Sequence, residues 1–264
     1  MTNLLFIADV IGSPGREVVR GLLPELRRRL DLHLVICNCE NSAAGYGVTR
    51  DTARDLFDSG CDVLTGGNHL WDKKDQLDYI GEEPRLVRPA NLPAGTPGQG
   101  WRVFKAANGT PVAVVNLLGR VFMKEADCPF RTADRALEAV GKEAKVAVVE
   151  LHAEASAEKV AMGWHLDGRA SLVVGTHTHV QTADERILPR GTAYISDVGM
   201  AGPFDSVLGR RVEDVLERFI SCVPVRFEVA DGNVQLHGVI VHIDENTGKA
   251  RSIQRIQRPV SAIP

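Results

Sequence analysis

The chain has 264 residues, of which 44% are hydrophobic and 25% are charged, and its formal net charge is −3. This length allows one large domain or two small ones, and the composition is that of an ordinary soluble globular protein. Because Lys and Arg are spread along a slightly acidic sequence, we expect no stable binding to duplex nucleic acid. A small phosphorylated substrate remains allowed, since metal ions can supply positive charge locally.

The sequence indicates a cytoplasmic protein without a membrane partner. No apolar run reaches the roughly 18 residues that cross a bilayer, and the N-terminus lacks the basic region of a signal peptide. The cysteines form no CxxC motif, so we expect reduced thiols that mostly fill core positions, with metal ligation by Cys37 and Cys39 as the alternative. A homo-oligomer stays open, and the C-terminal β-rich segment is a candidate interface.

The first part of the chain alternates strand-like and helix-like segments. We expect strands at residues 3–8, 33–37 and 62–65. A Gly-Ser-Pro-Gly turn at residues 12–15 precedes a helix with apolar residues at helical spacing, and Ser13 is its expected N-cap. Thr49 is the expected cap of a second helix that ends near Ser59. Short connections between these elements favour parallel crossovers.

From about Trp101 onward the pattern favours paired strands. Residues 103–106 and 112–117 flank Asn108-Gly109, which is a strong hairpin signal. Further strands are expected at residues 145–150, 172–175, 223–229, 234–243 and 250–256. We therefore predict a single domain, residues 1–264, in which two packed sheets are flanked by helices and the second sheet is largely antiparallel.

Polar side chains suited to metal binding follow several of the expected strands. They are Asp9, Glu40, Asn41, Asn68, His69, His152, His177 and His179. Ligand sites in open α/β sheets lie beyond the carboxyl ends of the strands, where several loops meet. Their common placement points to one metal site.

Taken one at a time, most of these residues also fit an ordinary role. In an extended segment the rings of His177 and His179 project to the same side, but a pair of exposed loop histidines fits them as well. Asp9 also suits the N-terminus of a helix, and Asn68 suits a simple turn. An ordinary structural role fits Glu40 less well, because an unpaired carboxylate at the end of an apolar strand is costly unless a cation meets it.

Together the motifs resemble those of the calcineurin-like metallophosphoesterase superfamily, whose blocks run D-x-H, G-D, G-N-H-[D/E], a lone His and G-H-x-H. The third block is present as Gly67-Asn68-His69, and the last as Gly175-Thr176-His177-Thr178-His179. The first block lacks its second histidine, and Glu40 replaces the usual aspartate. Both departures are similar to the bacterial YmdB-type branch, as are the stretches DVIGSPGR, ENSAAGYGVT and DGRASLVVGTHTHVQTAD.

This resemblance implies a four-layer αββα sandwich of two mixed β-sheets flanked by helices, with two divalent or trivalent metal ions per chain. The metals are usually iron or manganese in this branch, while the mixed ligand set also suits Zn, Co or Ni. It implies that one metal is held by Asp9, Glu40, Asn41 and His179. The other would be held by Asn68, His152, His177 and the bridging Glu40. His69 would face the substrate without binding metal.

The resemblance further implies a phosphodiesterase that acts on 2′,3′- and 3′,5′-cyclic nucleotides. Two cations bind phosphoryl oxygens and acidify water, so we expect attack by a metal-bridging hydroxide, with His69 as acid or oxyanion stabiliser. The alternatives are a phosphomonoesterase or nucleotidase on the same centre, or a metal-dependent regulatory protein that binds a ligand without turnover.

Three further residues are candidates for contact with the substrate. Tyr46 lies in the Gly-rich loop after Glu40, where it either stacks on a base or belongs to a plain connecting turn. Arg88 and Arg120 either contact phosphate or form structural and surface pairs.

Overall fold

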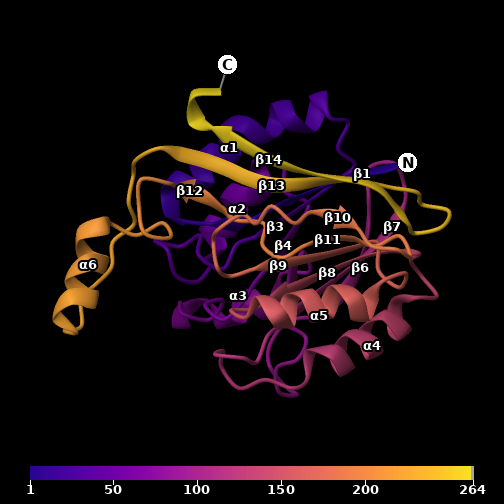
Figure 1. Ribbon diagram of the computed structural model, residues 1–264, viewed down its shortest axis with the longest axis horizontal. Coiled ribbons are helices and arrows are strands. Elements are labelled where there is room, and N and C mark those ends of the chain that lie inside the picture. Colours follow the sequence, from indigo (N-terminus) through magenta and orange to yellow (C-terminus); the bar gives the residue numbers. More distant parts are fainter. Residues whose placement is uncertain (263–264) are drawn as a thin grey trace.

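Two β-sheets occupy the middle of the molecule in the computed structural model, which describes residues 1–262 apart from the side chains of Asp75 and Ala262 (Figure 1). The first sheet has eight strands, in the order β2 (Asp9–Val10), β12 (Met200–Pro203), β13 (Val234–Ile243), β1 (Thr2–Ile7), β3 (Leu34–Asn38), β4 (Val63–Thr65) and β5 (Leu86–Val87), and β14 (Ala250–Pro259) also pairs with β13. The second sheet has six strands, in the order β10 (Arg186–Ile187), β11 (Ala193–Ile195), β9 (Leu172–Thr176), β8 (Val146–His152), β7 (Pro111–Leu118) and β6 (Trp101–Lys105).

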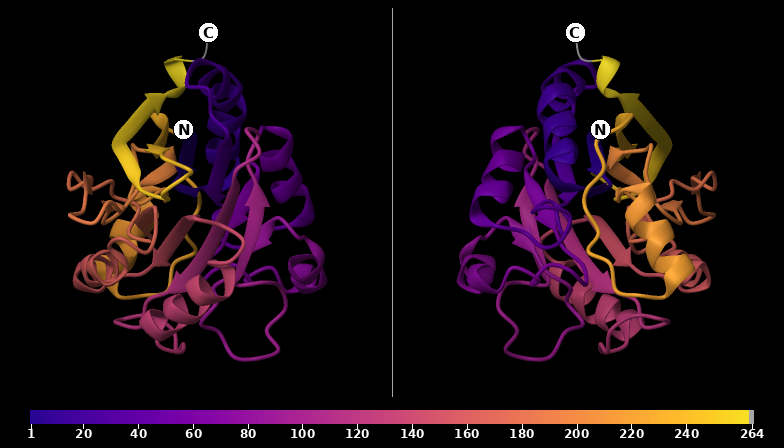
Figure 2. Two further views of the ribbon diagram at one scale, coloured as in Figure 1. Left: turned by 90° about the vertical axis from the view of Figure 1, so that its right-hand side faces the viewer. Right: turned by 90° about the vertical axis from the view of Figure 1, so that its left-hand side faces the viewer.

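Helices cover the outer faces of both sheets (Figures 1 and 2). The α-helices are α1 (Gly12–Arg29), α2 (Arg50–Asp58), α3 (Leu77–Glu82), α4 (Pro129–Val140), α5 (Ser156–Leu166) and α6 (Val212–Ser221), with short 3-10 turns at η1 (Lys74–Gln76) and η2 (Val260–Ala262). Helix α6 lies to the left of the sandwich in Figure 1, away from the other helices. Within the described residues no helix is both long enough and apolar enough to cross a membrane.

Separate apolar clusters hold the layers together. One cluster lies between the sheets and joins Phe6 of β1 to Val148 of β8. A second packs α1 and α2 on the first sheet, and a third packs α4 and α5 on the second sheet. Burying apolar side chains on both faces of a sheet requires a layer on each side. The predicted four-layer αββα sandwich of two mixed sheets is therefore confirmed.

Parallel strands at the middle of each sheet place their carboxyl ends at one edge. β1, β3, β4 and β5 run parallel in the first sheet, and β7, β8, β9 and β11 run parallel in the second. The parallel crossovers predicted for the first part of the chain are confirmed. The loops that follow these strands meet in the region described below.

The prediction that the second sheet is largely antiparallel is wrong. In that sheet β6 and β10 pair antiparallel with their neighbours, while the other pairings are parallel. The antiparallel C-terminal strands β13 and β14 join the first sheet instead, where β13 pairs with β1. Hairpin signals in a sequence fix which strands are neighbours, but they do not fix which sheet the hairpin joins.

The predicted turn at residues 12–15 and the Ser13 cap are also wrong. Helix α1 already begins at Gly12, and Ile11 stands at its N-cap without a side-chain hydrogen bond. The first N–H groups are bonded across the fold instead, from Ile11 to the Ala201 carbonyl and from Gly12 to the Asn41 carbonyl, each at 2.9 Å. Gly15 permits this approach, because a Cβ there would collide with the Ala201 carbonyl.

Other local predictions are confirmed. Thr49 caps α2 in a capping box with Thr52, and the Asn108-Gly109 turn joins the antiparallel strands β6 and β7.

The strand predicted at residues 223–229 is wrong. These residues form no strand and make only an isolated bridge between Arg210 and Val229. The backbone of Pro224 has no N–H to donate, so this stretch begins without a hydrogen-bond donor that a strand partner needs.

The cysteines are free thiols, as predicted. Cys37, Cys39 and Cys61 are buried, and all of them belong to the apolar cluster on the outer face of the first sheet. Burial raises the pKa of the Cys39 thiol well above its ordinary value. Cys37 and Cys39 therefore pack as apolar side chains.

Candidate metal centre

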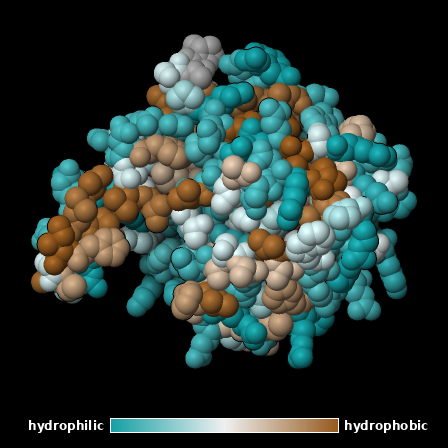
Figure 3. Space-filling model, in the orientation of Figure 1, coloured by the Kyte–Doolittle hydropathy of each residue, from teal (hydrophilic) through white to brown (hydrophobic). Residues whose placement is uncertain are grey.

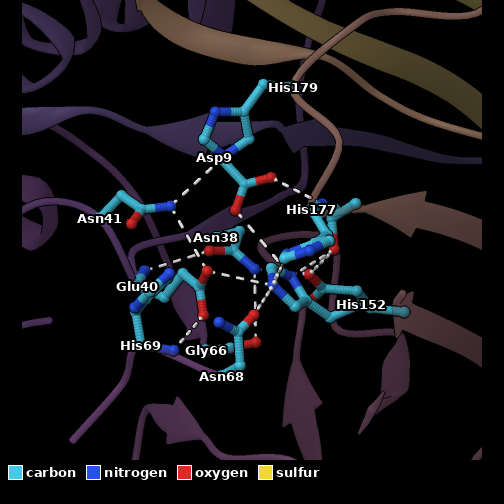
Figure 4. A network of polar contacts seen from close by, with 12 residues as sticks. Asp9, Asn38, Glu40, Asn41, Gly66, Asn68, His69, His152, His177 and His179 are labelled. Atoms are coloured by element: carbon cyan, nitrogen blue, oxygen red, sulfur yellow. Dashed lines mark hydrogen bonds and ion pairs between the residues drawn. The ribbon is translucent and has the colours of Figure 1, made fainter. Parts of the chain in front are cut away.

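Loops from both sheets bring the predicted metal-binding side chains into one cluster (Figure 4). Asp9 lies in β2, and His152 ends β8. The other members follow strand ends: Glu40 and Asn41 after β3, Asn68 and His69 after β4, and His177 and His179 after β9. Ligand atoms of Glu40, His152 and His177 lie within 4.8 Å of one another. The inter-sheet packing thus joins groups that are far apart in the sequence.

One ring nitrogen of His152 is surrounded by electron-pair donors. Its Nε2 lies 3.0 Å from Glu40 Oε1, 2.9 Å from Asn68 Oδ1 and 3.1 Å from His177 Nδ1. A single ring nitrogen offers at most one N–H, so it cannot donate to all of these neighbours. A cation placed among them would bind all of their lone pairs at once. These residues fit one metal ion with mixed oxygen and nitrogen ligands.

A second group of polar side chains lies next to the first and shares Glu40 with it. The Asn41 amide nitrogen Nδ2 lies 3.4 Å from both Glu40 Oε1 and His179 Nε2, and with the amide turned over its oxygen would face a metal there. Asp9 is fully buried, and its Oδ1 has no hydrogen-bond partner among the described residues. A buried carboxylate oxygen without a partner is costly unless a cation meets it. The donor set therefore fits a second metal ion, with Glu40 shared between the two positions.

The segment that carries the two outer histidines is a turn, not the extended segment that was predicted. The backbone φ is 94° at His177 and 61° at His179, and both values lie in the left-handed region. Residues other than glycine adopt it at an energetic cost, and such strain clusters at functional sites. Asp9 Oδ2 stabilises the turn by accepting a hydrogen bond of 3.1 Å from the His177 N–H.

Neighbouring groups fix which ring nitrogen of His152 and of His179 faces the site. Thr176 Oγ1 donates to Glu150 Oε1 at 2.7 Å, so it accepts from His152 Nδ1 at 2.9 Å. His179 Nδ1 donates to the Leu208 carbonyl at 3.1 Å. In both rings the proton on Nδ1 makes Nε2 the nitrogen that a metal would bind, once any second proton is displaced. Such outer partners orient metal-binding histidines and fix their tautomer.

A buried ion pair is hydrogen-bonded to the middle of the His177–His179 turn. Lys159 Nζ lies 2.7 Å from Asp197 Oδ2, and their side chains are 2% and 1% exposed. The same Asp197 oxygen accepts from the N–H of Thr178 at 3.2 Å and from its hydroxyl at 2.6 Å. No local motif indicates this contact, because Lys159 belongs to α5 and Asp197 follows β11.

Burial and charge shift the pKa values of the central pair in opposite directions. Burial alone would lower the pKa of His152, but Glu40, Asp9 and Glu150 around it raise the value to about 9. Burial likewise opposes ionisation of Glu40, but the charge of His152 and their hydrogen bond hold its pKa at about 2. Without metal the pair is therefore ionic at neutral pH.

Burial shifts the pKa values of Asp9 and His177 toward their uncharged forms. Burial raises the pKa of Asp9 well above its ordinary value, with Glu40 adding to the shift. Burial, together with the charge of His152, lowers the pKa of His177 to about 3. A neutral imidazole is the form that binds metal.

His69 lies beside the cluster without joining it. Its backbone N–H donates to Glu40 Oε2 at 2.9 Å, and its ring Nδ1 lies 2.7 Å from Asp72 Oδ2. Asp72 thereby holds the ring, and His69 lines the pocket above the site. This position suits the predicted role of a residue that faces the substrate.

The pocket above the cluster has a volume of about 260 Å³. Its lining includes Tyr46 but neither Arg88 nor Arg120. Arg88 instead donates to the carbonyls of Pro89 and Thr96, and Arg120 lines a different surface pocket. The geometry therefore favours Tyr46 over the two arginines as a group near the substrate.

Several residues that line the pocket were not predicted from the sequence. They are Val207, Leu208, Arg210, Val215, Phe219 and Phe227. All lie in the segment between β12 and β13, where no chemistry-bearing motif marks them.

Known proteins match this chain along nearly its whole length. A family model described as YmdB-like protein matches residues 5–256. The 2′,3′-cyclic-nucleotide 2′-phosphodiesterase of Bacillus subtilis (strain 168) is 52% identical over 254 residues, covering 96% of each chain. The crystal structure of a novel phosphatase from Mycoplasma pneumoniae has a TM-score of 0.92 at 34% identity, covering 98% of this chain and 93% of the other. The calcineurin-like phosphoesterase YfkN from Bacillus subtilis, 12% identical with a TM-score of 0.59 over 99% of this chain and 91% of its own, shares the fold.

Proposed function

This chain belongs to the family of YmdB-like proteins and is a phosphoesterase, and from that premise we propose that it is a dinuclear metal-dependent phosphodiesterase acting on cyclic nucleotides. The proposed substrates are 2′,3′- and 3′,5′-cyclic nucleotides. The similarity to a Bacillus subtilis enzyme named 2′,3′-cyclic-nucleotide 2′-phosphodiesterase supports the first of these.

One observation carries the metal-dependent part of the proposal. His152 Nε2 has oxygen and nitrogen donors of Glu40, Asn68 and His177 at 2.9–3.1 Å, a grouping that hydrogen bonds alone do not explain. We assign one metal position to Glu40, Asn68, His152 and His177, and the other to Asp9, Glu40, Asn41 and His179. Bound there, two metal ions would supply positive charge to the phosphoryl oxygens and acidify a water molecule.

In the proposed reaction, residues of the chain bind the substrate and supply the proton that the leaving group needs. The attacking water releases one proton to solvent as its oxygen forms a new bond to phosphorus, one ribose P–O bond breaks, and the leaving ribose oxygen takes up a proton. His69 donates that proton from the ring that Asp72 orients, and regains one from solvent. Because Asp9 and Glu40 are the carboxylates among the assigned ligands, the loaded site stays cationic and attracts an anionic diester.

Substrate comparison tests the proposed activity. Protein loaded with Mn²⁺ or Fe²⁺ should hydrolyse 2′,3′-cyclic AMP, 3′,5′-cyclic AMP and bis(p-nitrophenyl) phosphate faster than p-nitrophenyl phosphate. A phosphomonoesterase is the second candidate, favoured by the structural similarity to the Mycoplasma pneumoniae phosphatase. Hydrolysis of the monoester alone would establish that alternative. Metal analysis should find two ions per chain, and a lower content without gain of activity on adding Mn²⁺ would contradict the dinuclear centre.

A further inference from the structure

The pocket above the metal centre has two chemically different halves. Metal-binding candidates and His69 form one half. The other half consists of Tyr46, Arg210 and apolar side chains from the segment between β12 and β13, namely Val207, Leu208, Val215, Phe219 and Phe227. We call these five apolar side chains the apolar wall. When a phosphate is bound at the first half, the rest of its molecule would therefore face the apolar wall.

The apolar wall is directly connected to a metal-binding residue. The carbonyl of Leu208 accepts the hydrogen bond of 3.1 Å from His179 Nδ1, while the Leu208 side chain lines the pocket. The backbone φ of Leu208 is 53°, a left-handed value that leucine rarely adopts. Such strain is typical of positions that bind a ligand. This hydrogen bond ties the Leu208 part of the wall to His179.

The other part of this half is an ordered aromatic platform formed by Tyr46 and Arg210. The guanidinium carbon of Arg210 lies 3.8 Å from the centre of the Tyr46 ring, and Arg210 is only 8% exposed. Arg210 also donates to the carbonyl of Gly45, where any larger residue would collide with the guanidinium group. The Tyr46 ring packs edge-on against His69, with 5.2 Å between ring centres. Tyr46 is thus held in one orientation before any ligand arrives.

Phe219 at the pocket mouth is unusually exposed for an aromatic side chain. It is 75% exposed, although it lines the pocket together with the half-buried Phe227. Figure 3 shows apolar side chains gathered over α6 on the left of the molecule. Large exposed apolar side chains beside a cavity are typical of a surface that binds a ligand or another molecule.

We propose that Tyr46, Phe219 and Phe227 form a nucleobase subsite of this phosphodiesterase. The proposal rests on the proposed function, because a cyclic nucleotide joins a phosphate to a flat ring with two π-faces. Stacking on aromatic side chains binds every base, since each base has such faces. The Val, Leu and Phe side chains of the wall carry no hydrogen-bonding groups that read the edge of a base. The enzyme should accept all bases, with purines bound more tightly than pyrimidines.

A substrate without a base isolates the contribution of this subsite. We compare kcat/KM for 2′,3′-cyclic AMP with that for 1-deoxyribofuranose 2,3-cyclic phosphate, which has the same reacting group. Wild-type protein should prefer the nucleotide. Phe219→Ala and Phe227→Ala should each lower kcat/KM for the nucleotide about 5- to 100-fold, as the loss of one stacking partner predicts, and leave the base-free substrate unchanged.

Helix α6 offers a matched control for these variants. Ile220 is 82% exposed on the same helix and does not line the pocket, so Ile220→Ala should change neither rate. Truncating Phe219 at the surface leaves the fold intact. A binding measurement independent of turnover uses metal-free protein and adenosine 3′-phosphate. Saturation-transfer NMR should show transfer to the base protons with wild-type protein and a loss of transfer with Phe219→Ala.

The outcomes separate this inference from the proposed function. If wild-type protein hydrolyses both cyclic phosphates equally well, or if the phenylalanine variants lose both activities together, the subsite does not exist and the phosphodiesterase assignment stands. If metal-loaded wild-type protein hydrolyses neither compound, the proposed function is wrong and the subsite is excluded with it.

Discussion

Glu40 and His152 at the centre of the site behave as a preformed ion pair. Their side chains are completely buried, with the pKa of Glu40 near 2 and the pKa of His152 near 9. At neutral pH the proton on His152 occupies the nitrogen that a metal needs. Proton and metal therefore compete for the same lone pair.

Metal binding at pH 7 should release at least one proton per chain. Because the pKa of His152 in the metal-free protein is about 9, the apparent affinity should rise as the pH rises toward 9, about tenfold per pH unit for one displaced proton. Calorimetric titration with Mn²⁺ in buffers of different protonation enthalpy measures this release. Binding heats that do not depend on the buffer at pH 7 would contradict the predicted competition.

His69 should contribute to the rate without contributing to metal retention. His69→Ala should lower kcat for a cyclic nucleotide about 10²- to 10⁴-fold, the range expected for loss of a general acid. Metal content per chain should not change, because the His69 side chain points to Asp72 and the pocket. His242, which is bonded to Asn3 Oδ1 far along β13, supplies the control His242→Ala with normal turnover. An unchanged kcat in His69→Ala would remove the assigned role.

At the scale of elements, the two N-terminal helices begin in different ways. Helix α2 has its own capping box, in which Thr49 Oγ1 accepts from the Thr52 N–H at 3.2 Å. Helix α1 relies on carbonyls from β12 and from the loop after β3. The first start is encoded locally, and the second depends on the assembled fold.

This difference predicts unequal effects of two small substitutions. Thr49→Ala should lower the free energy of unfolding by about 0.5–2 kcal/mol, because it removes a true cap. Ser13→Ala should stay within about 0.5 kcal/mol, because the Ser13 hydroxyl caps nothing and its side chain is exposed. Urea unfolding of both variants measures the difference. Equal losses would mean that Ser13 caps α1 in solution.

The turn between β9 and β10 depends on the buried Lys159–Asp197 pair. Lys159→Met should destabilise the protein by about 3–5 kcal/mol, because Asp197 is left as an unpaired buried charge. Arg29→Met removes an exposed pair with Glu25 on α1 and should cost less than about 1 kcal/mol. Urea unfolding compares the two.

A double variant separates the stability of this turn from its position. Lys159→Met with Asp197→Leu should regain most of the stability, since no buried charge remains. Its affinity for Mn²⁺ should stay low, because Thr178, between His177 and His179, has lost its acceptor. Normal metal affinity in the double variant would show that the ion pair only stabilises the fold.

At the scale of the whole molecule, the candidate metal centre lies on a sandwich whose inter-sheet cluster consists of apolar side chains. The cluster between the sheets buries residues such as Phe6, Ile36 and Val148 completely. These contacts lie among apolar side chains and need no ion. The sandwich therefore keeps the ligands close together even without metal.

Chelation should abolish turnover and leave the fold in place. Protein treated with EDTA should lose hydrolysis of cyclic nucleotides and keep its far-ultraviolet circular dichroism spectrum. Mn²⁺ should restore activity and add about 2.7 kcal/mol of stability per occupied site when its free concentration is a hundred times the Kd of that site. His177→Ala should gain less stability from Mn²⁺. Loss of the circular dichroism signal on chelation would show that metal holds the sandwich together.

The sequence by itself determined several local elements and which polar side chains would lie together. Thr49, Asn108-Gly109 and the apolar runs encode their own helix, hairpin and strands, because capping, turn and periodicity depend on neighbouring residues. The motifs around Asp9, Glu40, Asn68 and His179 also predicted which side chains would be grouped. These features require no knowledge of distant contacts.

The tertiary structure alone decided the features that depend on distant partners. It placed β13 in the first sheet, started α1 on the carbonyls of Ala201 and Asn41, and held the His177–His179 turn on Lys159 and Asp197. It also brought Phe219 and Phe227 to the pocket beside Tyr46. None of these pairings leaves a periodic or local pattern, because each joins residues that only the packing of two sheets makes neighbours.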